Sequence, residues 1–287
     1  MPTLTRRSLL ALALLGCRRR HGAPARASRL ASGAPARRVV SLAPTATESL
    51  VALGFADRLV AVSSLCHGPA GLPRVGTMVA PDASAIAALR PDALVGVEGP
   101  VATTTLAPVL ATGLRRVFPR AETLEDYLRA LDDYAALVGA PASADALRRR
   151  ITEGAARVSR AVAGRARPKV LAVYTASPLV VAGAGSWVDA ALRAAGADNA
   201  AQSANRHPMI SPDQVAAWAP SLVLDLTVGG AETDVAAALA PASDDGGTAA
   251  TAPRVVRVDG ELVRRQGPRF AEAVAAIARA VHPGVAL

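Results

Sequence analysis

Apolar residues recur at helical spacing between Ser143 and Gly164, and this pattern predicts one long helix. Leu147 and Ile151 begin a stripe that continues through the later turns of the stretch. Ser143 is expected to cap the amino end of the helix, and Gly164 is expected to end it. About 20 residues with a rise of ~1.5 Å each form a rod of roughly 30 Å, about the width of a small domain.

The chain on one side of this helix resembles the chain on the other side. Residues 86–95 (IAALRPDALV) and 215–224 (VAAWAPSLVL) both predict the end of a helix, then a proline and a strand, at an offset of 129 positions. Residues 48–54 and 190–196 form a second similar pair, at an offset of 142. The repeat predicts two similar α/β lobes that flank one long helix, and a ligand is expected in the cleft between them.

Predicted strands and helices alternate along both halves, so the sheets are expected to be mostly parallel. The predicted strands are 38–41, 57–63, 93–97, 115–118, 169–174, 179–182, 222–226 and 254–258. The predicted helices, apart from the long one, are 47–53, 82–89, 101–111, 123–138, 187–196, 211–218, 231–240 and 268–281. Thr47, Asp82, Thr123 and Ser211 are the expected amino-terminal caps.

The positive charge of the chain is concentrated at its amino end. The chain has 32 basic and 23 acidic residues, a net charge of +9. The first 38 residues contain no acidic residue and nine arginines, at positions 6, 7, 18, 19, 20, 26, 29, 37 and 38. The remaining 23 basic residues (32 − 9) balance the 23 acidic ones, so a nucleic-acid-binding function for the folded body is not favoured.

The amino-terminal segment has the features of an export signal. Thr5–Leu10 (TRRSLL) resembles a twin-arginine signal, and Leu14–Cys17 (LLGC) resembles the site at which bacterial lipoproteins are cleaved and lipidated. We therefore expect residues 1–16 to be a signal peptide, Cys17 to carry a lipid, and residues 17–37 to be a disordered tether. The alternative is a plain secretory signal with an incidental cysteine. Either reading places the protein outside the cytoplasm, in the periplasm or on the outer face of the cytoplasmic membrane.

Few residues in the sequence suggest metal binding, nucleotide binding or catalysis. Cys66, His67 and His207 are the candidates for metal contact, but they lack the spacing of a zinc site. The chain has no P-loop and no nucleophile-elbow motif, and Gly183–Gly185 is not a complete dinucleotide fingerprint. These observations predict a protein that is not an enzyme and has no resident metal or cofactor.

Two positions at the ends of predicted strands are candidates for ligand contact. Ala43–Thr47 follow the first strand and offer free helix N–H groups to a polar ligand, although an ordinary capped turn also explains them. Tyr174 ends a strand that should point into the cleft, so ligand contact is at least as probable there as packing.

Several segments together resemble a known family. They are 38–54 (RVVSLAPTATESLVALG), 72–76 (LPRVG), 88–92 (ALRPD), 185–189 (GSWVD) and 258–269 (VDGELVRRQGPR). They resemble the substrate-binding proteins of ABC importers for vitamin B12 and iron complexes, and most of all the vitamin B12-binding branch. The resemblance implies a class III periplasmic binding protein with two Rossmann-like lobes joined by a helical backbone, and little hinge motion. The expected boundaries are 38–139 and 165–287 for the lobes and 140–164 for the helix between them.

The resemblance also implies site residues. Positions that line the corrinoid pocket correspond to Leu65, Met78, Val97, Tyr174, His207 and Arg265, with Cys66 and His67 beside them. Arg264 and Arg265 are expected to hold carboxylate or amide groups of the ligand. The family docks on its permease through one glutamate on each lobe, and here these positions hold Ser84, which has no charge, and Asp213.

The leading hypothesis is a monomeric, lipid-anchored receptor that captures a corrinoid and delivers it to an ABC permease and its ATPase. A ferric siderophore or haem is the alternative cargo. A chelatase-like enzyme is the alternative from another class, and a receptor-like sensor module is a third.

Overall fold

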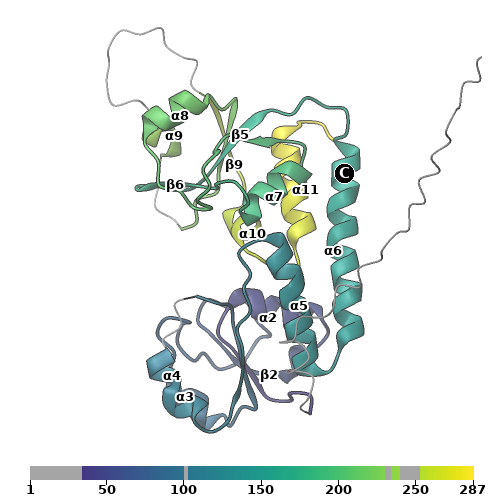
Figure 1. Ribbon diagram of the computed structural model, residues 1–287, viewed down its shortest axis with the longest axis vertical. Coiled ribbons are helices and arrows are strands. Elements are labelled where there is room, and N and C mark those ends of the chain that lie inside the picture. Colours follow the sequence, from purple (N-terminus) through teal and green to yellow (C-terminus); the bar gives the residue numbers. More distant parts are fainter. Residues whose placement is uncertain (1–33, 100–102, 230–233, 240–252) are drawn as a thin grey trace, which may run out of the picture.

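The computed structural model describes residues 34–99, 103–229, 234–239 and 253–287. The predicted signal peptide, Cys17 and most of the predicted tether therefore lie outside the described residues, as do parts of the predicted helices 101–111 and 231–240. Two α/β lobes lie one above the other, and the long helix α6 (Pro141–Ala161) runs along one side of both (Figure 1). In the described part of the chain, no helix combines the length and the apolar character needed to cross a membrane.

The amino-terminal lobe contains a four-stranded, wholly parallel sheet in the order β2-β1-β3-β4. Its strands are β1 (Val39–Ser41), β2 (Leu59–Val62), β3 (Ala93–Val95) and β4 (Arg115–Val117). Its helices are α2 (Pro44–Ala52), the 3-10 turn η1 (Ala56–Arg58), α3 (Ala83–Ala88) and α4 (Thr103–Leu110).

The carboxy-terminal lobe is built on a similar but larger sheet of five strands. Its sheet has the order β6-β5-β8-β9, and β7 also pairs with β5. Its strands are β5 (Lys169–Ala176), β6 (Leu179–Val181), β7 (Asp198–Asn199), β8 (Leu222–Asp225) and β9 (Arg254–Arg257). Its helices are α7 (Trp187–Ala194), α8 (Pro212–Trp218), α9 (Val235–Ala238), α10 (Gly260–Arg264) and α11 (Phe270–Val281). β6 is antiparallel to β5, and the other pairs are parallel.

The internal repeat is confirmed at the level of the backbone. Val39 pairs with Ala93 in one sheet, and Val170 pairs with Leu222 in the other, so the offset of 129 also relates β3 to β8. Arg90 and Ala219, related by the same offset, both have a φ of 45°. Each precedes a proline, which disfavours continuing the α-helical conformation. The two lobes therefore have the same backbone conformation at the turn from helix to strand.

Two predicted helix starts are wrong, for the same reason. α6 begins at Pro141 rather than at a Ser143 cap, and α2 begins at Pro44 rather than after Thr47. Proline lacks an N–H and has a helical φ, so it suits the first turn of a helix. The Thr47 hydroxyl instead donates to Ser41 Oγ at 2.8 Å and joins α2 to the end of β1.

The predicted caps of three other helices are confirmed. Asp82 and Ser211 accept from the backbones of α3 and α8. Thr123 accepts from the first turn of α5 (Leu124–Val138), and Gly139 ends that helix with a φ of 74°. Sequence reasoning missed the short helix α10 and the two-residue strand β7.

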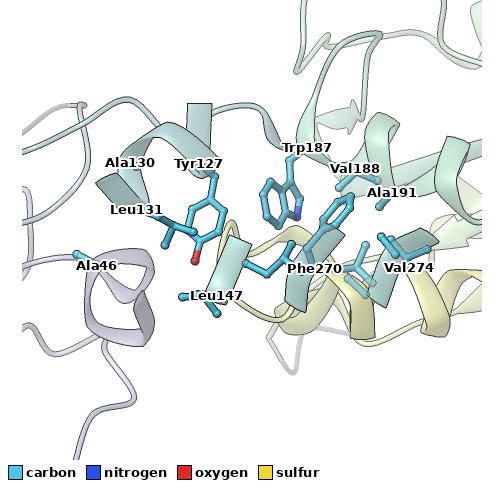
Figure 2. Close-up of a cluster of buried hydrophobic side chains, with 14 of the residues drawn as sticks. Ala46, Tyr127, Ala130, Leu131, Leu147, Trp187, Val188, Ala191, Phe270 and Val274 are labelled. Carbon is cyan, nitrogen blue, oxygen red and sulfur yellow. The ribbon is translucent and has the colours of Figure 1, made fainter. Parts of the chain in front are cut away.

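The two lobes share a core built by α5, α6, α7 and α11. The Trp187 ring, which is 1% exposed, contacts Tyr127 edge-on at 5.6 Å and Phe270 at 4.8 Å (Figure 2). One continuous cluster of buried apolar residues includes these rings and extends from Val39 in β1 to Val281 in α11. Packing across the boundary between the lobes therefore fixes how they face each other.

Candidate functional site

A cavity of about 670 Å³ lies between the lobes at the carboxyl ends of their strands. We call it the front cavity. The amino-terminal lobe contributes residues 42–45 after β1 and the side chains of Leu65, Met78 and Val97. The carboxy-terminal lobe contributes residues 174–177 at the end of β5, 227–228 after β8, and 260–261 and 264–266 around α10. Open α/β sheets bind ligands at this end of their strands.

The Tyr174 side chain contributes a polar group to the wall of the front cavity. Its ring lies 5.3 Å from the ring of His207 and 5.1 Å from the guanidinium carbon of Arg264. Burial raises the pKa of the Tyr174 phenol to about 12, against smaller opposing effects of the Ser186 hydroxyl and Arg264. The phenol therefore stays protonated at neutral pH. Desolvation lowers the pKa of His207, although Glu122 opposes this shift.

Arg264 is the cation of the front cavity that is available to a ligand. Its Nη1 donates to the backbone oxygens of Tyr174 and Leu226 at 3.3 and 3.4 Å, which holds the guanidinium against the Tyr174 ring. Among the ion pairs found in the described residues, none includes Arg264. A carboxylate, phosphate or amide oxygen of a ligand can accept further hydrogen bonds from the Arg264 guanidinium.

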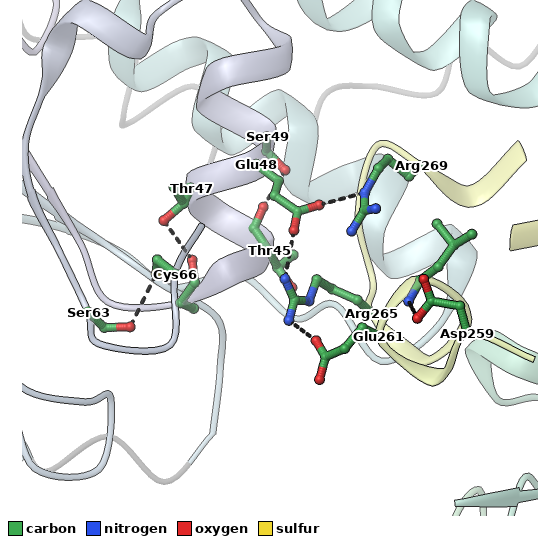
Figure 3. A network of polar contacts seen from close by, with 12 residues as sticks. Thr45, Thr47, Glu48, Ser49, Ser63, Cys66, Asp259, Glu261, Arg265 and Arg269 are labelled. Carbon is green, nitrogen blue, oxygen red and sulfur yellow. Dashed lines mark hydrogen bonds and ion pairs between the residues drawn. The ribbon is translucent and has the colours of Figure 1, made fainter. Parts of the chain in front are cut away.

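Arg265 lies beside it in a different electrostatic setting. Its Nη1 bonds to Glu48 Oε1 at 3.0 Å, and its Nη2 also contacts Glu261 (Figure 3). Arg269 reaches the other oxygen of Glu48 at 3.4 Å. Glu48 belongs to α2 and both arginines to the carboxy-terminal lobe, so these contacts tie the lobes together. Arg206 and Glu122 form a second tie between the lobes at 3.1 Å.

The structure brings six of the predicted ligand-contacting residues to the front cavity. They are Leu65, Met78, Val97, Tyr174, Arg264 and Arg265. Their contact with a ligand stays a prediction. Ala43, Pro44 and Thr45, from the turn after the first strand, also line this cavity.

Three other predicted residues do not line the front cavity. Cys66 is buried inside the amino-terminal lobe, where its Sγ lies 3.1 Å from Ser63 Oγ. His67 lines a second cavity of about 880 Å³, the rear cavity, which α2, α6 and α11 border. His207 is exposed, and its ring lies 5.3 Å from the Tyr174 ring. Within the described ranges, no group of three or more histidine, cysteine, aspartate or glutamate side chains is arranged to hold a metal ion.

The predicted docking residues occupy equivalent places on the two lobes. Ser84 is exposed in the first turn of α3, and Asp213 is exposed in the first turn of α8. The repeat offset of 129 relates them. Sequence reasoning missed Glu48 and Glu261. The four-residue spacing of Glu261 and Arg265 could have indicated their ion pair, whereas nothing local links Glu48 to an arginine 217 positions away.

Comparison with known proteins agrees with this geometry. The family profile described as periplasmic binding protein matches residues 39–235. The chain is 28% identical over 193 residues to a vitamin B12-binding protein of Salmonella typhimurium, which covers 66% of this chain and 72% of that protein. It is 28% identical over 258 residues to a cobalamin-binding protein of Halobacterium salinarum, which covers 85% of this chain and 69% of that protein.

A solved structure of a periplasmic haem-binding protein from Pseudomonas aeruginosa is also similar. Its TM-score is 0.68 at 30% sequence identity, and the match covers 88% of this chain and 94% of that one. The matched profile spans more than half of the chain, and the similar haem-binding protein is 30% identical over most of both chains. The chain therefore belongs to the periplasmic binding protein family, the solute-binding components of ABC importers.

Proposed function

We propose that the protein captures a corrinoid between its lobes and delivers it to an ABC permease. The observation that carries this proposal is the contrast between the two walls of the front cavity. Leu65, Met78 and Val97 present an apolar wall, and Tyr174 and Arg264 present a polar, cationic one. A cobalamin has a broad macrocycle with amide side chains around its edge and one phosphate in its nucleotide loop, so it matches both walls.

Exposed apolar side chains at the cavity add support. Leu65 is 62% exposed and Val228 45% exposed, and both line the front cavity. Each Å² of apolar surface that a ligand covers contributes about 25 cal/mol. A large macrocycle covers more of this surface than a small hydrophilic solute does. The names of the relatives from Salmonella and Halobacterium point to the same cargo.

Haem is the second candidate. The similar protein from Pseudomonas aeruginosa is a haem-binding protein. Arg264, which has no carboxylate partner among the described residues, suits a haem propionate, and the Tyr174 phenol lies next to it. In either case the protein binds and releases its cargo without making or breaking a covalent bond in it.

Calorimetric titration of the purified protein with cyanocobalamin, haem and a ferric siderophore tests the proposal. We expect cyanocobalamin to bind with micromolar or tighter affinity, about −8 kcal/mol or better. Arg264→Gln should weaken binding about tenfold. The control Arg160→Gln, at an exposed position of α6 away from both cavities, should leave it unchanged. Binding of haem alone would favour haem as the cargo. If none of the three compounds binds, both the corrinoid and the haem proposals are refuted.

We further infer that the protein is exported and anchored through a lipid on Cys17. Metabolic labelling with radioactive palmitate should mark the full-length chain and not a Cys17→Ser variant. Equal labelling of both would contradict the anchor.

We infer that the protein docks on its permease through the exposed first turns of α3 and α8. Asp213→Asn should weaken permease binding in a pull-down with the reconstituted transporter, because it removes the one acidic side chain of the pair. Ser84→Glu should strengthen binding, and the absence of both effects would place docking elsewhere.

A further inference from the structure

Arg265 stands at the boundary between the front and rear cavities. Its side chain lines both, whereas Glu48 lines only the rear one. The Arg265 side chain is 15% exposed and that of Glu48 is 12% exposed, so solvent screens this pair only partly. A cargo in the front cavity would therefore contact the Arg265 guanidinium, whose positive charge is already balanced by the carboxylates of Glu48 and Glu261.

Glu48 is held in place from several directions. It lies on α2 one residue before Ser49, whose hydroxyl meets the Tyr127 hydroxyl at 3.1 Å in the shared core. Arg269 contacts the second oxygen of Glu48, which leaves the carboxylate facing both arginines (Figure 3). These two ion pairs hold the Glu48 carboxylate beside Arg265, so it keeps compensating the guanidinium charge when a ligand arrives.

The charge presented to the cargo follows from this arrangement. Without Glu48, Arg265 would retain only Glu261, whose side chain is 49% exposed and more strongly screened by water. Arg265 would then join Arg264 as a second available cation. An anionic cargo would gain from this change, and an uncharged cargo of the same shape would not.

We propose that Glu48 sets the charge selectivity of the cargo cavity by positioning and neutralising Arg265. The inference rests on the proposed function, because it assumes that the front cavity holds the cargo. Glu48 acts through Arg265 and does not touch the ligand, so it is a positioning residue. It favours a cargo with few negative charges over one with several.

Two porphyrins of matched shape test this inference separately from the identity of the cargo. Haem carries two carboxylates, and haem dimethyl ester carries none. Affinities for both, from absorbance titrations, are compared in the wild type and in Glu48→Gln, which keeps a hydrogen-bond acceptor and removes the charge. We expect the preference for haem over its ester to rise about tenfold, equivalent to ~1.4 kcal/mol.

Two further variants separate selectivity from a merely structural role. Glu272→Gln removes an equal charge from the rear cavity, has no described contact with Arg265, and should leave the preference unchanged. In an Arg265→Gln background, Glu48→Gln should no longer alter the preference, because the two effects act through one pair.

Equal changes in affinity for both porphyrins would show that Glu48 only ties the lobes together, and would overturn the inference. Failure of the wild type to bind cyanocobalamin would overturn the corrinoid proposal alone, since the porphyrin pair still reports on charge. Failure of every variant to bind any porphyrin would overturn the inference as well.

Discussion

Replacing Trp187 with alanine is expected to lower the free energy of unfolding by about 3–5 kcal/mol. The indole is 1% exposed and joins Tyr127 of α5 to Phe270 of α11, so the change leaves a cavity where the two lobes meet. Each of the two edge-on ring contacts contributes about 0.5–1.5 kcal/mol beyond buried area, which places the loss toward the upper end of the range.

Trp187→Phe is expected to cost far less, within about 1 kcal/mol of the wild type. Trp187 Nε1 is buried and has no hydrogen-bond partner among the described residues. A buried, unpaired donor costs about 1–3 kcal/mol, so removing it offsets the packing lost with the smaller ring. The two variants together therefore distinguish the packing of the ring from the penalty of its N–H.

Urea unfolding followed by far-ultraviolet circular dichroism measures both changes, since it does not depend on tryptophan emission. Trp218→Phe, at a partly buried position packed against the carboxy-terminal lobe alone, is the matched control and should shift the midpoint little. A cost for Trp187→Phe equal to that of Trp187→Ala would refute the reasoning about the unpaired N–H. A cost for Trp187→Ala below about 1 kcal/mol would refute the interlobe packing itself.

Three further predictions follow from the backbone and from His207. Gly183→Ala should destabilise the protein by about 2–3 kcal/mol in urea unfolding, because the added Cβ would lie 1.9 Å from the backbone oxygen of Asn205; unchanged stability would contradict this packing. Ala219→Gly should stabilise the protein by up to about 1 kcal/mol by relieving a φ of 45°, whereas Ala217→Gly inside α8 should cost about 1 kcal/mol; equal effects would refute the strain. The pKa of His207 is lower in the folded protein than in the unfolded chain, so the unfolded chain binds the proton more tightly and stability should fall as the pH decreases through about 6.5. An NMR titration of the imidazole checks the pKa, and a His207→Gln variant that keeps the same pH dependence of unfolding would contradict the assignment.

Local patterns in the sequence were sufficient for much of the fold. The caps at Thr123 and Ser211 and the stop at Gly139 were predictable because a capping bond joins residues three or four positions apart. The repeat at an offset of 129 predicted the two lobes, since each copy contains a complete helix-to-strand turn. The starts of α2 and α6 were misplaced because a proline in the first turn competes with a nearby threonine or serine as the signal for a helix start.

The candidate site also shows which features local sequence patterns predict and which they do not. Leu65, Cys66 and His67 are consecutive, yet the structure places them at the front cavity, in the lobe interior and at the rear cavity. The path of a loop decides such directions, and no periodic pattern in the sequence encodes that path. The sequence therefore predicted the lobes and the ends of the strands that line the front cavity, because strand ends follow from local pattern.

Only the tertiary structure showed which charges meet. Glu48 and Arg265 are 217 positions apart, and their ion pair forms because α2 of one lobe faces the end of α10 of the other. The energy of such a pair depends on distance and burial, and both are properties of the packed chain. The sequence alone determined that this protein has two lobes, and the packing of the lobes decided which charged side chains meet at the cavity between them.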